Sequence, residues 1–186
     1  MTDLYDWPCQ GTRPKAPKID GATSAHRALG RRLAAIHAMY LLEIGRLRRA
    51  MERTIAGDEH TGHLRDAVSS MQMMSNVRQY GVLCGRQCAA LTIHHTIEDE
   101  AIFPLLHGRE AGLTAVVERL MAEHLVIHDL LEALEAAAVD TVKAPGPDSF
   151  ARLRTAFETL ERAIQSHFGY EQEELEEAIG YFDVPL

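Results

Sequence analysis

The chain has 186 residues, and its 19 Lys plus Arg against 27 Asp plus Glu give a formal net charge of −8. That sign disfavours nucleic acid as a partner, because such binding relies on the neutralisation of phosphates. Hydrophobic residues (46%) and charged residues (25%) stand in the proportion of a globular protein. No uncharged stretch approaches the roughly 20 residues that a bilayer crossing needs, and the N-terminus lacks the apolar core of a signal peptide. We expect a soluble, cytoplasmic protein with no membrane partner.

Residues 1–20 contain three of the seven prolines and show no apolar periodicity. Proline and polar residues without a period are typical of irregular backbone. The sequence therefore predicts an irregular N-terminal arm over residues 1–20 and one domain over residues 21–182.

Apolar residues recur at steps of three and four in four separate runs of the domain, which is the period of an amphipathic helix. The first run is capped by Thr23 or Ser24 and continues to about Ile55. The other three cover about residues 77–103, 113–142 and 149–179. No stretch alternates with period two, so strands are not expected. Four long helices with short connections predict an all-α, up-down-up-down antiparallel four-helix bundle.

Polar side chains interrupt these apolar stripes at a regular spacing of four. Residues four apart lie about 5–6 Å from each other on one helical face, so each pair offers two donor atoms to one small volume. The first helix adds one histidine on the side that we expect to face inward. The predicted inward set is His26, His94, Glu98, His124, His128, His167 and Glu171.

A bundle core holds such side chains only if something satisfies them. Burying an unpaired polar group costs roughly 1–3 kcal/mol, so seven of them would consume the stability of a typical domain. Imidazole mixed with carboxylate suits iron, manganese or zinc, and seven donors are too many for one ion. The pattern predicts a dinuclear metal site in the bundle core.

Other residues compete for these roles. His95 and Asp99 are also four apart, but they lie about 100° from the apolar stripe, toward the helix flank or solvent, so we favour His94 with Glu98. His37 is interpreted as a hydrogen-bonded core histidine. Further interpretations concern a buried apolar role for Cys84 and Cys88, core or loop anchoring by Met71, Met73 and Met74, and solvated positions for His60, His63 and His107.

Four segments together resemble the hemerythrin-like (HHE cation-binding) family: SAHRALGRRL, HHTIEDEAIFP, EHLVIH and SHFGYE. The resemblance covers about residues 24 to 180. It is strongest to the variant with the pattern H, HxxxE, HxxxH, HxxxE that occurs among actinobacterial hemerythrin-like proteins.

The resemblance implies two non-haem iron ions with an oxo or hydroxo bridge. The implied terminal ligands are His26, His94, His124, His128 and His167, with Glu98 and Glu171 as bridging carboxylates. The oxygen carriers of the family end in HxxxxD, whereas His167 and Glu171 are four apart, and relatives with this ending are associated with peroxide or nitric oxide chemistry. The expected function is a reaction with hydrogen peroxide, nitric oxide or dioxygen. The alternative is reversible dioxygen or nitric oxide binding for storage or sensing.

Tyr170 directly precedes the predicted ligand Glu171. Among the tyrosines it is the candidate for a redox role, or for a contact to a metal ligand, beside an open iron position. No other catalytic residue is assigned, and the sequence indicates no oligomeric state.

Overall fold

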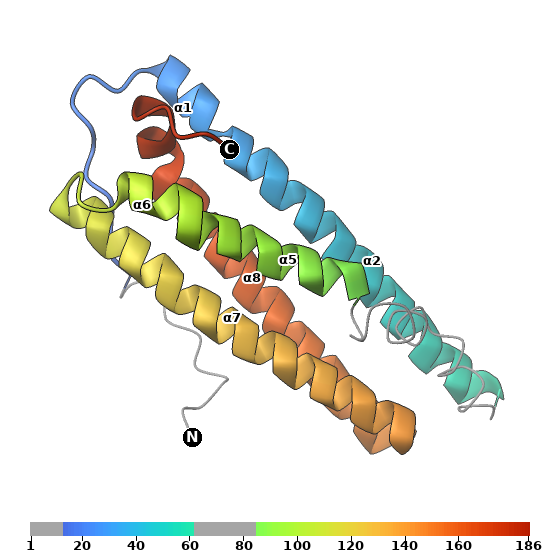
Figure 1. The fold of residues 1–186 in the computed structure, drawn as a ribbon. Helices are drawn as coiled ribbons and strands as arrows, with labels where there is room; N and C mark the ends of the chain where they lie inside the picture. The colour runs from blue at the N-terminus through green and yellow to red at the C-terminus, as the bar shows by residue number, and fades with distance from the viewer. Residues whose placement is uncertain (1–12, 62–84) are drawn as a thin grey trace. The chain divides into compact units, whose positions relative to one another are not determined.

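The structure of the chain is a computed structural model that describes residues 13–61 and 85–186 (Figure 1). Its elements are α1 (Ser24–Gly30), α2 (Arg32–Thr61), α5 (Gly85–Ile97), the π-helix η2 (Glu98–Ile102), α6 (Phe103–Leu106), α7 (Ala111–Lys143) and α8 (Pro147–Tyr181). No strand occurs within these two ranges. The predicted all-α fold class, a four-helix bundle, is confirmed.

Some sequence predictions concern residues outside this description. They include the start of the second helix near residue 77, the roles of Cys84, Cys88, Met71, Met73 and Met74, and the solvation of His60 and His63. The structure describes none of these side chains.

The first helical segment begins as predicted but has a break after its second turn. Thr23 is the N-cap of α1: its hydroxyl accepts from the His26 backbone N–H, and Nδ1 of His26 accepts from the Thr23 backbone N–H. This reciprocal pair is a capping box, in which two otherwise unsatisfied donors of the first turn find acceptors. Arg31 then separates α1 from α2.

Two glycines let α1 and α8 touch backbone to backbone. A Cβ atom at Gly30 would lie 1.8 Å from the carbonyl oxygen of Glu176. A Cβ atom at Gly180 would lie 1.7 Å from the carbonyl oxygen of His26. Only glycine leaves room for this approach, which fixes α1 on the C-terminal end of α8.

The chain divides into two compact units. Unit 1 comprises residues 1–39, 93–127 and 163–186. Within it, the successive helical segments α2, α5–α6, α7 and α8 alternate in direction (Figure 1). Their facing sides bury a core that consists of Leu33, Ile102, Phe103, Leu106, Leu113, Val116, Val117, Leu120, Tyr170, Leu175, Ala178, Ile179 and Val184.

Unit 2 comprises residues 40–92 and 128–162. Its described core is apolar and includes Met51, Ile55, Leu91, Leu130, Leu134, Phe150, Leu153, Phe157 and Leu160. Ion pairs between helices flank this core, with Arg154 lying 2.9 Å from Glu52 and Arg48 contacting Glu161. No inward-facing group of histidines and carboxylates lies among the described residues of this unit.

Among the helices that the structure describes, none combines the length and the apolarity of a bilayer-spanning segment.

Candidate metal centre

Three buried histidines from three helices converge in unit 1. His95 of α5, His124 of α7 and His167 of α8 each offer one ring nitrogen, and these nitrogens lie within 4.8 Å of one another. Nε2 of His124 is 3.1 Å from Nε2 of His167. The rings of His95 and His124 are stacked with centroids 4.0 Å apart. We call these three residues the histidine cluster.

A second group of donors lies on the other side of the same core. It consists of His37 of α2, His94 of α5 and Glu98 of η2, whose ligand atoms also lie within 4.8 Å of one another. Oε1 of Glu98 is 3.1 Å from Nε2 of His94 and 3.8 Å from Nε2 of His37. We call these three residues the mixed cluster.

Two carboxylates connect the clusters. The second oxygen of Glu98, Oε2, is 3.5 Å from Nε2 of His124 in the histidine cluster. Glu171 of α8 reaches both sides, because its Oε2 is 3.3 Å from Nε2 of His37 and 3.8 Å from Nε2 of His167. All of these side chains are buried. The two clusters therefore form one continuous set of five imidazoles and two carboxylates.

Burial shifts the pKa values of His37, His94, His95 and His167. It lowers the pKa of His37 to about 2, of His94 to about 3 and of His167 to about 4, and neighbouring histidines add to the effect. The pKa of His95 is lowered as well, first by burial and then by His124 and His167. These four imidazoles are neutral at physiological pH, so each ring carries one N–H and one nitrogen with a lone pair.

The two carboxyl groups are perturbed in the opposite direction. Burial, followed by the proximity of Glu171, raises the pKa of Glu98 well above its ordinary value. Burial raises the pKa of Glu171 to about 8. Both carboxyl groups take up protons when no positive charge is close. A cation between them would stabilise their ionised form, so the site favours cation binding.

The donor atoms that face each other are not satisfied by hydrogen bonds. Among the described side chains, the buried Nε2 atoms of His37 and His95 and both carboxylate oxygens of Glu98 and Glu171 have no hydrogen bond of good geometry. Each buried polar atom without a hydrogen bond lowers the free energy of unfolding by roughly 1–3 kcal/mol. Bound metal would satisfy these atoms, and imidazole nitrogen with carboxylate oxygen is a donor set for iron, manganese or zinc. The residues therefore fit a metal centre.

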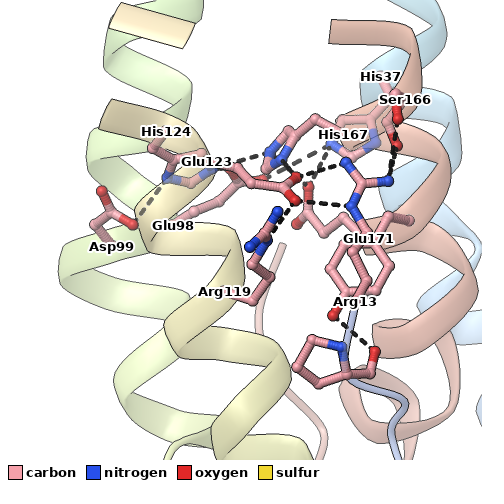
Figure 2. Close-up of polar contacts among 12 residues, drawn as sticks. Arg13, His37, Glu98, Asp99, Arg119, Glu123, His124, Ser166, His167 and Glu171 are labelled. Atoms are coloured by element: carbon pink, nitrogen blue, oxygen red, sulfur yellow. Dashed lines mark hydrogen bonds and ion pairs between the residues drawn. The ribbon is translucent and has the colours of Figure 1, made fainter. Parts of the chain in front are cut away.

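Further polar groups hold the rings from behind. Asp99 Oδ1 is 2.9 Å from Nδ1 of His124, and Glu123 Oε2 is 3.2 Å from Nδ1 of His167 (Figure 2). The side-chain amide of Gln172 lies 2.8 Å from Nδ1 of His37. At His124 and His167, the carboxylate acceptor at Nδ1 leaves Nε2 as the lone-pair nitrogen, which is the usual arrangement behind a metal-binding histidine.

Aromatic side chains line the same core. Phe168 stacks on His37 with centroids 3.8 Å apart, and Phe103 stacks on His124 with centroids 5.6 Å apart. Both phenylalanines are fully buried. They limit the access of water to the donors and lower the local dielectric, which strengthens any charge interaction with a bound cation.

Residues 28–179 match the family described as the hemerythrin HHE cation-binding domain. This match covers most of the chain and includes every residue of the two clusters and Glu171. The chain belongs to the hemerythrin HHE family. No curated protein and no solved structure matches it. The evidence for the arrangement of the seven donors in this HHE domain is therefore their distances and their burial.

The structure places His26, a predicted ligand, away from the two clusters. Its ring nitrogen takes part in the capping box with Thr23, and the ring packs edge-on against Tyr181. Eleven residues separate it from His37, a distance of about 16 Å along a helix. His37, one of the most deeply buried residues of the HHE domain, occupies the position in the first helical segment that we expected for His26.

The structure also places His128, another predicted ligand, away from the two clusters. Its side chain is 56% exposed and lies 3.4 Å from Glu132 on the surface of α7. The buried face of α7 continues from His124 to Ile127 and Leu131, a step of three followed by a step of four. His128 lies beside this face, and the fifth imidazole is His95.

His95 lies inside although we expected it at the helix flank. His94 and His95 are both buried, at 7% and 6% exposure. An inward face of a bundle helix is about 100° wide, which is the angle between neighbouring residues, so both edges of the face can carry a ligand. Asp99 is partly exposed and contacts His124 from behind, and it belongs to neither cluster.

Tyr170 is buried but its hydroxyl has another partner. It donates to the carbonyl oxygen of Pro14 over 2.8 Å, and the Arg13 guanidinium lies 4.6 Å from its ring centroid. Tyr170 thus anchors the N-terminal residues 13–14 instead of pointing its hydroxyl at the donor set. Sequence reasoning missed Glu123, whose adjacency to His124 was the available signal, and Arg13, for which the sequence offers none.

Proposed function

We propose that this HHE domain binds two iron ions and reacts with a small oxidant or gas, namely hydrogen peroxide, nitric oxide or dioxygen. The observation that carries the proposal is the pairing of two three-donor clusters with a carboxylate that is close to both. A single structural ion has no use for seven donors, whereas two neighbouring ions do.

The proposed terminal ligands are the five buried imidazoles of His37, His94, His95, His124 and His167, and the proposed bridges are Glu98 and Glu171. This set has the same number of histidines and carboxylates as the set that the sequence suggested. Two histidines are exchanged, because His26 and His128 lie away from the core.

Iron supplies the redox change, cycling between the ferrous and ferric states. The chain supplies neutral imidazoles, two carboxylates whose negative charge the metal offsets, and the apolar surface of Phe103 and Phe168. Hydrogen peroxide suits such a site, because its disproportionation needs no outside reductant. One peroxide gives up two electrons and two protons to become dioxygen, and a second accepts them to become two molecules of water.

Metal content and reactivity together test the proposal. Protein produced with ample iron is expected to contain about two irons per chain and to consume peroxide with release of dioxygen. Azide, as a small anion, is expected to bind the ferric form and to inhibit that consumption. A stoichiometry near one, or a preference for zinc over iron, contradicts the dinuclear proposal.

Stopped-flow spectroscopy of the reduced protein separates turnover from reversible binding. Rapid oxidation by peroxide with repeated turnover supports the enzymatic role. A spectral change on exposure to dioxygen or nitric oxide that reverses when the gas is removed supports storage or sensing instead. An iron-loaded protein that responds to none of these molecules, azide included, is coordinatively closed, and that result overturns both roles.

A further inference from the structure

The segment just before the first helix is attached to the core of unit 1 by a buried arginine. The side chains of Arg13 and Glu123 are each only 2% exposed. Nε of Arg13 donates to Oε1 of Glu123 over 2.7 Å, and Nη2 donates to Oε2 over 2.8 Å. The remaining nitrogen, Nη1, donates to the backbone carbonyl of Ser166 (3.1 Å) and to its hydroxyl (3.0 Å).

The Glu123 carboxylate also contacts His167, a member of the histidine cluster. Oε2 of Glu123, which accepts from Arg13, is 3.2 Å from Nδ1 of His167. Arg119 donates to Oε1 of Glu123 over 2.8 Å from the partly exposed side. Figure 2 shows Arg13, Arg119 and His167 directed at the Glu123 carboxylate. Arg13, Glu123 and His167 therefore form a chain of contacts that leads from the N-terminal segment into the donor set.

The two-pronged contact restricts the carboxylate more than a single charge could. A guanidinium binds both oxygens of a carboxylate in one plane, so it fixes the orientation of the group as well as its charge. With that orientation fixed, Oε2 of Glu123 is the acceptor for the Nδ1–H of His167. The lone pair of Nε2 on His167 then points to His124, 3.1 Å away.

The backbone of the segment holds Arg13 in place independently of this pair. The Tyr170 hydroxyl donates to the Pro14 carbonyl (2.8 Å), and the backbone N–H groups of Ala16 and Ile19 donate to Glu174 (2.6 Å) and Glu177 (2.7 Å) on α8. Four attachment points within seven residues, Arg13 included, leave the segment few alternative conformations. The Arg13 guanidinium is therefore preorganised beneath the metal centre.

We propose that Arg13 is a positioning residue of the metal centre. It orients the ring of His167 through Glu123, so the N-terminal segment contributes to the geometry of the site. This inference rests on the proposed metal centre for its effect on iron, but the orientation of His167 is a property of the metal-free chain.

The first measurement uses metal-free protein and asks which nitrogen of His167 carries the proton. Nitrogen-15 correlation spectra of the histidine rings, assigned with a His167→Gln variant, are expected to show the Nδ1–H form in the natural chain. In Arg13→Gln the carboxylate loses its fixed plane, and a mixture of the two ring forms is expected. Lys15→Gln is the matched control, because Lys15 belongs to the same segment and pairs with Glu174 but is 63% exposed.

The second measurement follows the release of iron from loaded protein to an excess of a coloured chelator. Loss of such a partner behind a metal-binding histidine typically weakens a site 10–100-fold. We expect Arg13→Gln to release the first iron roughly 10-fold faster or more. The double variant Arg13→Gln with Glu123→Gln is expected to be no faster, because both changes break the same chain of contacts. Lys15→Gln is expected to stay within about twofold of the natural chain.

These results distinguish the possible failures. If Arg13→Gln keeps the Nδ1–H form of His167 and releases iron at the control rate, the positioning role is overturned. If the natural chain holds no iron, the proposed function fails, while the ring spectra still decide the role of Arg13. Should Arg13→Gln not fold, Arg13→Lys keeps the charge but loses the two-pronged contact. It is then expected to give an intermediate rate and a partial mixture of ring forms, and control behaviour in both would overturn the inference.

Discussion

Oε2 of Glu171 lies 3.3 Å from Nε2 of His37 and 3.8 Å from Nε2 of His167, so one carboxylate on α8 serves a histidine of each cluster. Without a cation, the same position is unfavourable for a charged group, because burial raises the pKa of Glu171 to about 8. Glu171, one of the two carboxylates that connect the clusters, is thus also a source of instability in the metal-free chain.

Glu171→Gln is expected to have opposite effects on metal and on stability. The amide cannot bridge two cations as a carboxylate does, so iron content should fall below one half of the natural value. At pH 8 the metal-free variant should melt several degrees higher than the metal-free natural chain, because the neutral amide needs no proton in the core. Iron analysis and calorimetry at pH 8 check the two parts. Equal melting temperatures would indicate that the Glu171 carboxyl is hydrated when the metal is absent.

The metal-free protein is expected to be most stable near about pH 6 to 6.5. The buried histidines have lowered pKa values, so the unfolded chain alone binds their protons, and stability falls as the pH drops below their ordinary value of 6.5. Glu98 and Glu171 have raised pKa values, so stability falls as the pH rises from their ordinary value of 4.5 toward about 8. Melting temperatures between pH 5 and 8.5 should show a maximum with losses on both sides. A monotonic profile would contradict the buried titration of one of the two groups.

Four histidine variants separate the two possible ligand sets. His37→Gln and His95→Gln are expected to lose at least half of the bound iron, because each removes an imidazole that lies within 4.8 Å of two other donors. His26→Gln and His128→Gln should retain it, since one histidine belongs to a helix cap and the other is on the surface. Iron per folded chain and the absorption spectrum of the ferric protein are the measurements. The reverse pattern would restore the set that the sequence first suggested.

Removing the metal is expected to lower the melting temperature well beyond experimental error. A ligand that binds only the folded state adds stability in proportion to the logarithm of its concentration over its dissociation constant, about 4 kcal/mol at a thousandfold excess. For a domain of this size such a loss corresponds to roughly 10 °C. Calorimetry before and after treatment with a chelator, followed by reloading with iron, measures it. If the two forms melt together, the donor atoms of the buried set do not hold the metal.

A pair of glycine variants tests the contact between α1 and α8. Gly180→Ala would place a methyl group 1.7 Å from the His26 carbonyl oxygen, so the helices must separate, at a cost of about 1–3 kcal/mol or more. Gly169→Ala lies on the same helix with open space around it, and alanine there should stabilise the helix by about 0.5–1 kcal/mol. Denaturant unfolding of both variants provides the comparison. Equal effects of the two substitutions would show that the backbones are not in contact.

Periodicity predicted the fold class well but resolved the inward face only to within one residue. On α7, the buried positions Leu120, His124, Ile127 and Leu131 follow a regular alternation of steps of four and three. The same alternation can be read from the sequence. The prediction of His128 as an inward residue departs from it, because the spacing of four between His124 and His128 favours a pair of ligands. His26 fits the period of its helix, but it lies in the first turn, where capping claims its ring.

The other differences between the predicted and the observed site arise from contacts between distant parts of the chain. A local sequence pattern does not encode such contacts. His95 is inside because helices on both sides of α5 offer it neighbours, His124 and His167. Arg13 finds Glu123 across 110 positions of the sequence, in an arm that composition alone described as irregular. Such pairings depend on how helices from distant parts of the chain pack, and the spacing of residues within one helix carries no information about them.

The π-helical turn η2 has consequences for any attempt to transplant this centre. Its wider turn, closed by the Phe103 N–H donating to the Glu98 carbonyl, holds one residue more than an ordinary helical turn would. At its start, the consecutive residues Glu98 and Asp99 contact the same imidazole at its two nitrogens, Nε2 and Nδ1 of His124. Deleting one residue from this turn would rotate everything after it by about 100°, carrying Phe103 and Leu106 out of the core. A design that copied only the HHxxE residues onto a regular helix would therefore lose the extra residue of the π-helical turn. The helix after the ligands would then turn Phe103 and Leu106 away from the core.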